Sequence, residues 1–276
     1  MTDTITTPAT FTGPPDSCHI LTPAPDPIIP ELTAPAARPE WEVHVSPRYL
    51  AGSGFEADAA MVPLTEGAGW NSWCDELANW HITSPCGRAY LGFLPESNPE
   101  PVGLWKAWVR PHHHGARAWM AAFSDEMPYE FMAAFSAYWA EGYRPDDPTF
   151  AQPDDDHRDG VKTVLTVLRD AGWDRDPNTA PGRTLERWTA PDGRAGVEVR
   201  VHVRGSVETE IIQGEPRWTI WAAHAPYRRP LWDAVFSTGT PTGLIAAFCR
   251  ALADPAPLIR EDHHIPRACR DLVTRA

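Results

Sequence analysis

The chain has 276 residues, of which 42% are apolar and 22% charged, as is typical of a soluble globular protein with one large or two small domains. No apolar run approaches the roughly 20 residues of a membrane span. The first residues, MTDTITTPATFTGPPDS, lack the basic start and apolar centre of a secretory signal. The five cysteines are scattered and contain no C-x-x-C pair, which argues against a disulfide scaffold or a zinc ribbon and favours reduced thiols in a cytoplasm.

The net charge is −13, and two segments carry most of it. Residues 1–42 hold six acids and one base, and residues 141–159 hold seven acids and two bases, so about −3 is left for the rest. A near-neutral remainder neither indicates nor forbids a nucleic-acid partner.

Composition divides the chain into five parts. Residues 1–40 are rich in Pro, Thr and Ala, which predicts a disordered arm because such a segment cannot build a packed core. A first repeat is predicted over 41–143, an acidic linker over 144–160 and a second repeat over 161–255. Residues 256–276 are predicted to form a tail with a short helix.

The two repeats are copies of one pattern. SPCGR at 84–88 returns as APDGR at 190–194, with the Pro, Gly and Arg each 106 residues later. Nine residues return 113 positions later, so that the second copy repeats Trp105, Trp108, Trp119, Phe123, Ser124, Pro128, Ala133, Ala134 and Phe135. The offset changes once between these blocks, as an insertion would require.

Each copy is predicted to contain four short antiparallel strands and then one helix, after a lead-in segment that carries AGW. The lead-in of the second copy, GVKTVLTVLRDAGW, has apolar residues at helical spacing, whereas Pro63 limits the first to a turn or two. The Pro-x-Gly motifs predict tight turns. VEVRVHVR alternates as a half-buried strand does. The fold class is therefore α+β, with two β-β-β-β-α repeats packed as a pseudo-symmetric pair.

The third strand of each copy carries two tryptophans, Trp105 and Trp108 in the first and Trp218 and Trp221 in the second. Residues three apart on a strand point to opposite faces of the sheet. One ring of each pair packs under the helix. The other is either covered by the other repeat or exposed as a stacking platform for a base or another aromatic ligand.

Several motifs, in this order, resemble the SPDY-type domain, an actinobacterial domain of unknown function that often occurs as two copies. They are VSPRYLAG, AGW, SPCGRAYLGFLPE, the Trp-bearing strand and MPYEFMAAF, and the resemblance covers roughly residues 43–255. The four-residue signature of the family, Ser-Pro-Asp-Tyr, is altered to Ser-Pro-Cys-Gly in the first copy and to Ala-Pro-Asp-Gly in the second. The Pro and Gly that form the turn are present in both copies. The resemblance implies a fold and no established activity. The element order is also similar to the Whirly-type architecture, which binds single-stranded DNA; this is an analogy of topology.

The candidate binding residues are Arg88, Trp108, Arg194, Arg200, Arg204 and Trp221. The arginine after each Pro-x-Gly turn either holds a phosphate or carboxylate or binds turn carbonyls. The histidine run 112–114 and the EDHH segment 261–264 are interpreted as solvated loops, because successive residues rarely converge on one ion. No metal and no cofactor are therefore predicted.

No P-loop, G-x-S-x-G, G-x-G-x-x-G or H-E-x-x-H motif is present, so we expect a protein that is not an enzyme. The first hypothesis is a protein-interaction or scaffold module with an unknown protein partner. The alternative is a module that binds single-stranded nucleic acid through Trp- and Arg-bearing sheet faces. A small-molecule enzyme comes third. No membrane partner is expected.

Overall fold

A computed structural model describes residues 42–54, 57–96, 103–144, 157–177, 184–200, 206–226 and 228–275. The predicted disordered arm and Arg204 lie outside these ranges. None of the described helices has the length and apolarity needed to cross a membrane.

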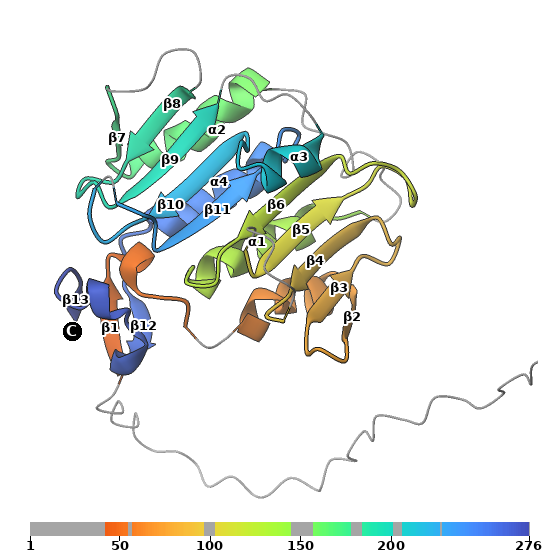
Figure 1. The fold of residues 1–276 in the computed structure, drawn as a ribbon, viewed down its shortest axis with the longest axis horizontal. Helices are drawn as coiled ribbons and strands as arrows, with labels where there is room; N and C mark the ends of the chain where they lie inside the picture. The colour runs from red at the N-terminus through yellow and green to blue at the C-terminus, as the bar shows by residue number, and fades with distance from the viewer. Residues whose placement is uncertain are drawn as a thin grey trace, which may run out of the picture. The chain divides into compact units, whose positions relative to one another are not determined.

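Within the described residues, the two copies form one antiparallel sheet of ten strands, in the order β2-β3-β4-β5-β6-β11-β10-β9-β8-β7 (Figure 1). The first copy contributes β2 (Asn71–Cys74), β3 (Trp80–Thr83), β4 (Ala89–Phe93), β5 (Trp105–Val109) and β6 (Trp119–Phe123). The second contributes β7 (Asp174–Arg175), β8 (Thr184–Thr189), β9 (Ala195–Arg200), β10 (Trp218–Ala222) and β11 (Trp232–Phe236). β6 pairs with β11 at the centre, with Ala122 opposite Val235, so the copies join edge to edge.

Three helices lie on one side of this sheet: α1 (Tyr129–Gly142), α2 (His157–Asp170) and α4 (Thr242–Ala253). α4 packs against both α1 and α2. Another of the described helices, α3 (Val207–Ile212), lies on the opposite side, in front of the sheet in Figure 1. We call that opposite side the open face.

The core lies between the sheet and the three helices. The apolar stripes predicted for the closing helices are buried, including Phe135 of α1 and Phe248 of α4. Phe123 of β6 contacts both of these rings and Phe236 of β11, with ring centroids 5.4 to 5.9 Å apart. Residues of the two copies therefore share one continuous apolar core.

The predicted fold class and the duplication are confirmed, and two details are added. Each copy has a fifth strand, β2 or β7, directly after its AGW segment. The change of offset falls in the connection from β9 to β10, which contains α3. The Pro-x-Gly turns form as predicted: Gly87 and Gly193 have φ of +67° and +69°, which favours glycine, and their amides bind the carbonyls of Ser84 and Ala190.

The chain's ends differ from the prediction. β1 (Glu42–Ser46) pairs with β12 (Leu258–Glu261) and β13 (Thr274–Arg275) in a separate three-stranded sheet. In place of the expected short helix, the tail contains these strands and two single 3-10 turns, Asp262–His264 and Arg267–Cys269, because Pro266 interrupts the segment. α2 begins at His157, inside the segment predicted as a linker.

Candidate functional site

The open face shows every second residue of the sheet strands. In β5 and β10 the burial alternates, so that Trp105 and Trp218 point into the core while Trp108 and Trp221 are half-buried on the open face. The strand register places Tyr90 of β4 opposite Trp108, and Gly196 of β9 opposite Trp221. Residues 90 and 196 occupy the same position in the two copies, so this difference decides what surrounds each tryptophan.

The first copy carries a continuous row of rings across its open face. We call it the aromatic row: Trp73, His81, Tyr90 and Trp108, one residue from each of β2 to β5. Trp73 stacks on His81 with ring centroids 5.3 Å apart, and Tyr90 stacks on Trp108 at 5.0 Å and 13°. Trp73, at the edge of the sheet, is 47% exposed. Aromatic side chains therefore fill this half of the face.

A chain of hydrogen bonds holds the aromatic row in place. His81 lies 3.0 Å from the Asp75 carboxylate through Nε2 and 2.8 Å from the Tyr90 hydroxyl through Nδ1. Because a carboxylate only accepts, Nε2–H donates to Asp75, and in the neutral ring Nδ1 accepts the Tyr90 O–H. Burial, with the charge of Asp75, raises the pKa of Tyr90 to about 12. The phenol therefore stays protonated at neutral pH. These hydrogen bonds hold the rings in position and do not activate a nucleophile.

Trp108 is also covered by the second copy. Met120, Ala122 and Ile211 of α3 form a small apolar cluster on the open face, and Trp108 packs against it. Arg117 stands 5.4 Å from the Trp108 ring and binds Glu208 of α3 at 3.1 Å. The inserted helix of the second copy thus reaches across the central seam onto the first.

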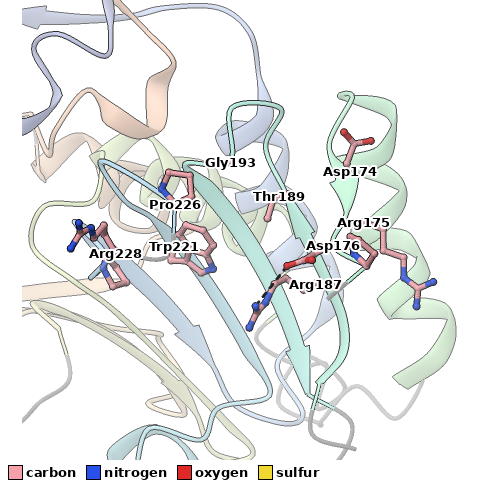
Figure 2. A pocket seen from close by; sticks show the side chains of 11 residues that line it. Asp174, Arg175, Asp176, Arg187, Thr189, Gly193, Trp221, Pro226 and Arg228 are labelled. Atoms are coloured by element: carbon pink, nitrogen blue, oxygen red, sulfur yellow. Dashed lines mark ion pairs between the residues drawn. The ribbon is translucent and has the colours of Figure 1, made fainter. Parts of the chain in front are cut away.

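The second copy has a pocket of about 440 Å³ where the first has its aromatic row (Figure 2). We call it the Trp221 pocket. Its lining residues are Asp174, Arg175, Asp176, Pro177, Arg187, Thr189, Gly193, Trp221, Pro226, Arg228 and Pro230. Counted from the AGW segments, which are 103 residues apart, Asp176 replaces Trp73. Counted from the Pro-x-Gly turns, which are 106 residues apart, Arg187 and Gly196 replace His81 and Tyr90. Loss of three rings leaves the hollow.

The Trp221 ring lies over Gly196, and in this position of the ring only glycine fits. A Cβ built on Gly196 would stand 2.5 Å from the ring, closer than real contacts allow. The small residue lets the indole lie down along the sheet and form an apolar part of the pocket beside Pro226. The absence of a side chain at Gly196 therefore leaves space for the pocket and keeps the Trp221 ring as one of its walls.

Ion pairs neutralise most of the charge around this pocket. Arg187 binds Glu198 at 2.6 Å and lies 3.8 Å from Asp176, and Arg175 binds Glu186 at 2.7 Å. Arg228 is exposed at the rim. Since each paired guanidinium already has a carboxylate, the pocket offers little net positive charge for a phosphate.

The arginines of the two turns have matching contacts. Arg88 donates to the Pro111 carbonyl at 3.1 Å, and Arg194 donates to the His224 carbonyl at 3.4 Å. The two carbonyls are 113 residues apart, so the contact is the same in both copies. These bonds tie each turn to the loop after the third strand, which favours the structural alternative for both residues.

The structure does not gather all the predicted site residues. Trp221 lies in the pocket, Trp108 lies under α3, and Arg200 stands 3.9 Å from Glu198. Sequence reasoning missed Asp176, Arg187 and Thr189, which line the pocket. Aligning the two copies could have identified these positions. In that alignment an aromatic or imidazole side chain of the first copy corresponds to a charged residue or glycine in the second.

Comparison with known families agrees with the repeat. The family model of the SPDY domain, a domain of unknown function (DUF317), matches residues 83–145 and 189–258. The chain contains two tandem matches to the SPDY domain family. The two matched ranges are its two tandem SPDY copies, and they contain β4 to α1 of the first and β9 to α4 of the second. No curated protein and no solved structure matches the chain, so the likeness to the Whirly architecture rests on element order alone.

Proposed function

We propose that this protein is a non-enzymatic, cytoplasmic interaction module that holds a partner protein on the open face of its second SPDY copy. The Trp221 pocket receives one anchor side chain of the partner. The observation that supports the proposal is the contrast on one continuous sheet: the first copy fills its face with rings, while the second leaves a hollow with an indole surface.

The chemistry of the pocket suits a protein anchor. Partner proteins insert a few large side chains into desolvated pockets, and tryptophan is among the residues that contribute most to such contacts. Trp221, Pro177 and Pro226 offer apolar surface, and Thr189 and Arg228 offer polar groups at the rim. Apolar walls with a few polar groups are typical of sites that recognise an amphipathic side chain.

Single-stranded nucleic acid is the second candidate, and it is favoured by one observation on the first copy. Trp73 is 47% exposed and stacked on His81, and Arg110 lies 4.5 Å from the Trp108 ring. An exposed ring at one end of the row and a guanidinium over the ring at the other end resemble parts of a base-stacking platform. The ion pairing of Arg117, Arg187 and Arg200 by carboxylates weakens this candidate.

A small-molecule enzyme remains third. The volume of the pocket, about 440 Å³, is within the range of small-ligand sites. Its described lining residues include no His, Cys or Ser to act as a nucleophile or an imidazole base.

The experiment is site-specific photo-crosslinking of the full chain in a nuclease-treated cytoplasmic extract. A crosslinker replaces Arg228, at the pocket rim, and in the control it replaces Arg169, which is 63% exposed on α2 across the sheet. We expect a discrete protein adduct from position 228 and none from position 169. Trp221→Ala should lower the yield of that adduct at least about tenfold, because a central anchor contact is lost.

An adduct of equal yield with Trp221→Ala would reject the pocket as the anchor site. Fluorescence anisotropy of labelled single-stranded DNA at low salt tests the second candidate. Salt-sensitive binding at micromolar protein that Trp73→Ala abolishes would support nucleic acid in place of a protein partner.

A further inference from the structure

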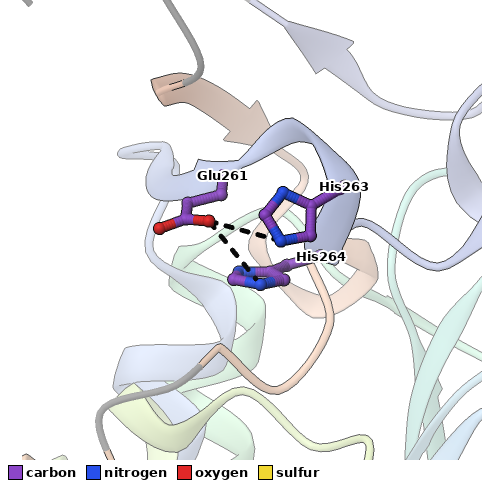
Figure 3. A group of neighbouring side chains, drawn as sticks. All are labelled: Glu261, His263 and His264. Carbon is purple, nitrogen blue, oxygen red and sulfur yellow. Dashed lines mark ion pairs between the residues drawn. The ribbon is translucent and has the colours of Figure 1, made fainter. Parts of the chain in front are cut away.

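A second group of side chains, none of which lines the Trp221 pocket, converges at the end of β12. Glu261 ends β12, and His263 and His264 lie in the 3-10 turn that follows. Figure 3 shows the three side chains turned towards one another. One ligand atom from each residue lies within 4.8 Å of the other two. The sequence predicts a solvated loop for this segment and does not indicate the convergence.

The distances fit a single bound ion. One oxygen, Oε2 of Glu261, lies 3.4 Å from Nε2 of His263 and 3.7 Å from Nε2 of His264. Ligand atoms around a tetrahedral zinc ion, at bonds of about 2.0–2.2 Å, stand roughly 3.4 Å apart. An ion at the centre of the three atoms would therefore reach all of them with only small movements.

The surrounding contacts hold the segment rigidly. Arg260, one residue before Glu261, is buried and binds both carboxylate oxygens of Glu130 as well as the Gly52 carbonyl. On the other side, Asp262 binds Arg275 at 2.8 Å. Since its neighbours are held on both sides, the backbone that carries the Glu261 side chain is held in place.

The backbone of the turn is held as well. Gly52 has φ of +78°, and a Cβ there would stand 2.8 Å from the His264 carbonyl. This close approach seats the turn against the loop after β1, and the His264 side chain is only 14% exposed. Because the backbone is already held, binding an ion costs less conformational entropy here than it would on a flexible loop.

We propose that Glu261, His263 and His264 bind a divalent transition-metal ion of the zinc type. Two imidazole nitrogens and one carboxylate oxygen form a donor set that suits zinc and its neighbours better than calcium or magnesium, which prefer oxygen ligands. Glu42 lies opposite Glu261 across the β1–β12 pair and adds negative charge nearby. His263 is 68% exposed, so the fourth position opens to water.

The test is a titration of the full chain, freed of any purification tag and of metal, with Co²⁺ as a spectroscopic probe for zinc. We expect visible absorption bands of a low-symmetry site at one equivalent, and their disappearance when Zn²⁺ displaces the probe. His263→Ala and Glu261→Gln should each weaken Co²⁺ binding by about tenfold or more, because each removes one ligand.

The control is the triple variant His112→Ala, His113→Ala and His114→Ala, which removes an exposed histidine run elsewhere in the chain. This variant should titrate as the wild type does. The wild-type chain giving no bands at millimolar Co²⁺ would overturn the proposal. So would bands that survive His263→Ala and vanish in the triple variant.

Discussion

The two SPDY copies share their strands, turns and closing helix, yet their open faces differ. In the first copy Trp73, His81 and Tyr90 fill the space beside the third-strand tryptophan. In the second, Asp176, Arg187 and Gly196 stand at the equivalent positions, and a pocket results. The core positions, by contrast, keep their aromatic residues in both copies, as Trp119 and Trp232 do.

The comparison shows that packing constrains the residues on the two sides of the sheet to different degrees. The side under the helices must be filled to build the shared core, so large apolar residues recur there. Outside the small cluster of Met120, Ala122 and Ile211, the open face can vary after duplication without removing a core contact.

The largest predicted effect tests whether the copies are one cooperative body. Phe123→Ala and Phe236→Ala each remove a fully buried ring from the centre of the shared core. Each should lower the free energy of unfolding by about 3–5 kcal/mol, because a cavity is left in place of a phenyl group. Urea unfolding followed by tryptophan fluorescence should show one transition, shifted by a similar amount in the two variants.

Arg169→Ala is the control, since its side chain is 63% exposed and forms an ion pair with the exposed Asp170 beside it. It should change the free energy of unfolding by less than about 0.5 kcal/mol. Two separate transitions in Phe123→Ala would show that the copies unfold independently, against a shared core.

A smaller loss of stability is expected when Gly196 of the second copy is replaced by tyrosine, the residue at the equivalent position of the first copy. Gly196→Tyr places a ring where a Cβ alone would stand 2.5 Å from Trp221, so the indole must move. We expect a loss of about 1–3 kcal/mol in the free energy of unfolding, as for other overpacked sites. The same variant should abolish the crosslink at position 228, because the hollow is closed.

The smallest effect concerns the support of the aromatic row. Hydrogen bonds from Asn79 and His81 lower the pKa of Asp75 in the folded protein. A lowered pKa means that the carboxylate contributes stability above its unfolded pKa of about 4, and that this contribution is lost as the pH falls. Asp75→Asn should therefore be less stable than the wild type at pH 7, with the gap closing below about pH 4.

Thermal unfolding of both proteins across this pH range measures the gap. Tyr90→Phe serves as its control, because it removes the hydroxyl bound to His81 and keeps the carboxylate. A gap between wild type and Asp75→Asn that stays constant from pH 7 to pH 3 would contradict the assigned role of Asp75.

Local patterns determined much of this protein in advance. Pro and Gly at 85 and 87 specify a tight turn, alternation marks a half-buried strand, and the helical spacing from Val161 to Leu168 marks a buried helix face. These signals act between residues close in the chain, so one sequence suffices to read them. The duplication is likewise visible, because residues fixed by the core recur at a constant offset.

Only the tertiary structure decided how the copies meet and what they leave open. The pairing of β6 with β11, the reach of α3 onto Trp108 and the convergence of Glu261 with His263 and His264 join residues through register and packing. Register depends on which strand edges find each other, and the residue types alone do not encode that choice. The same tryptophan, repeated at one offset, therefore became covered in one copy and pocket-lining in the other.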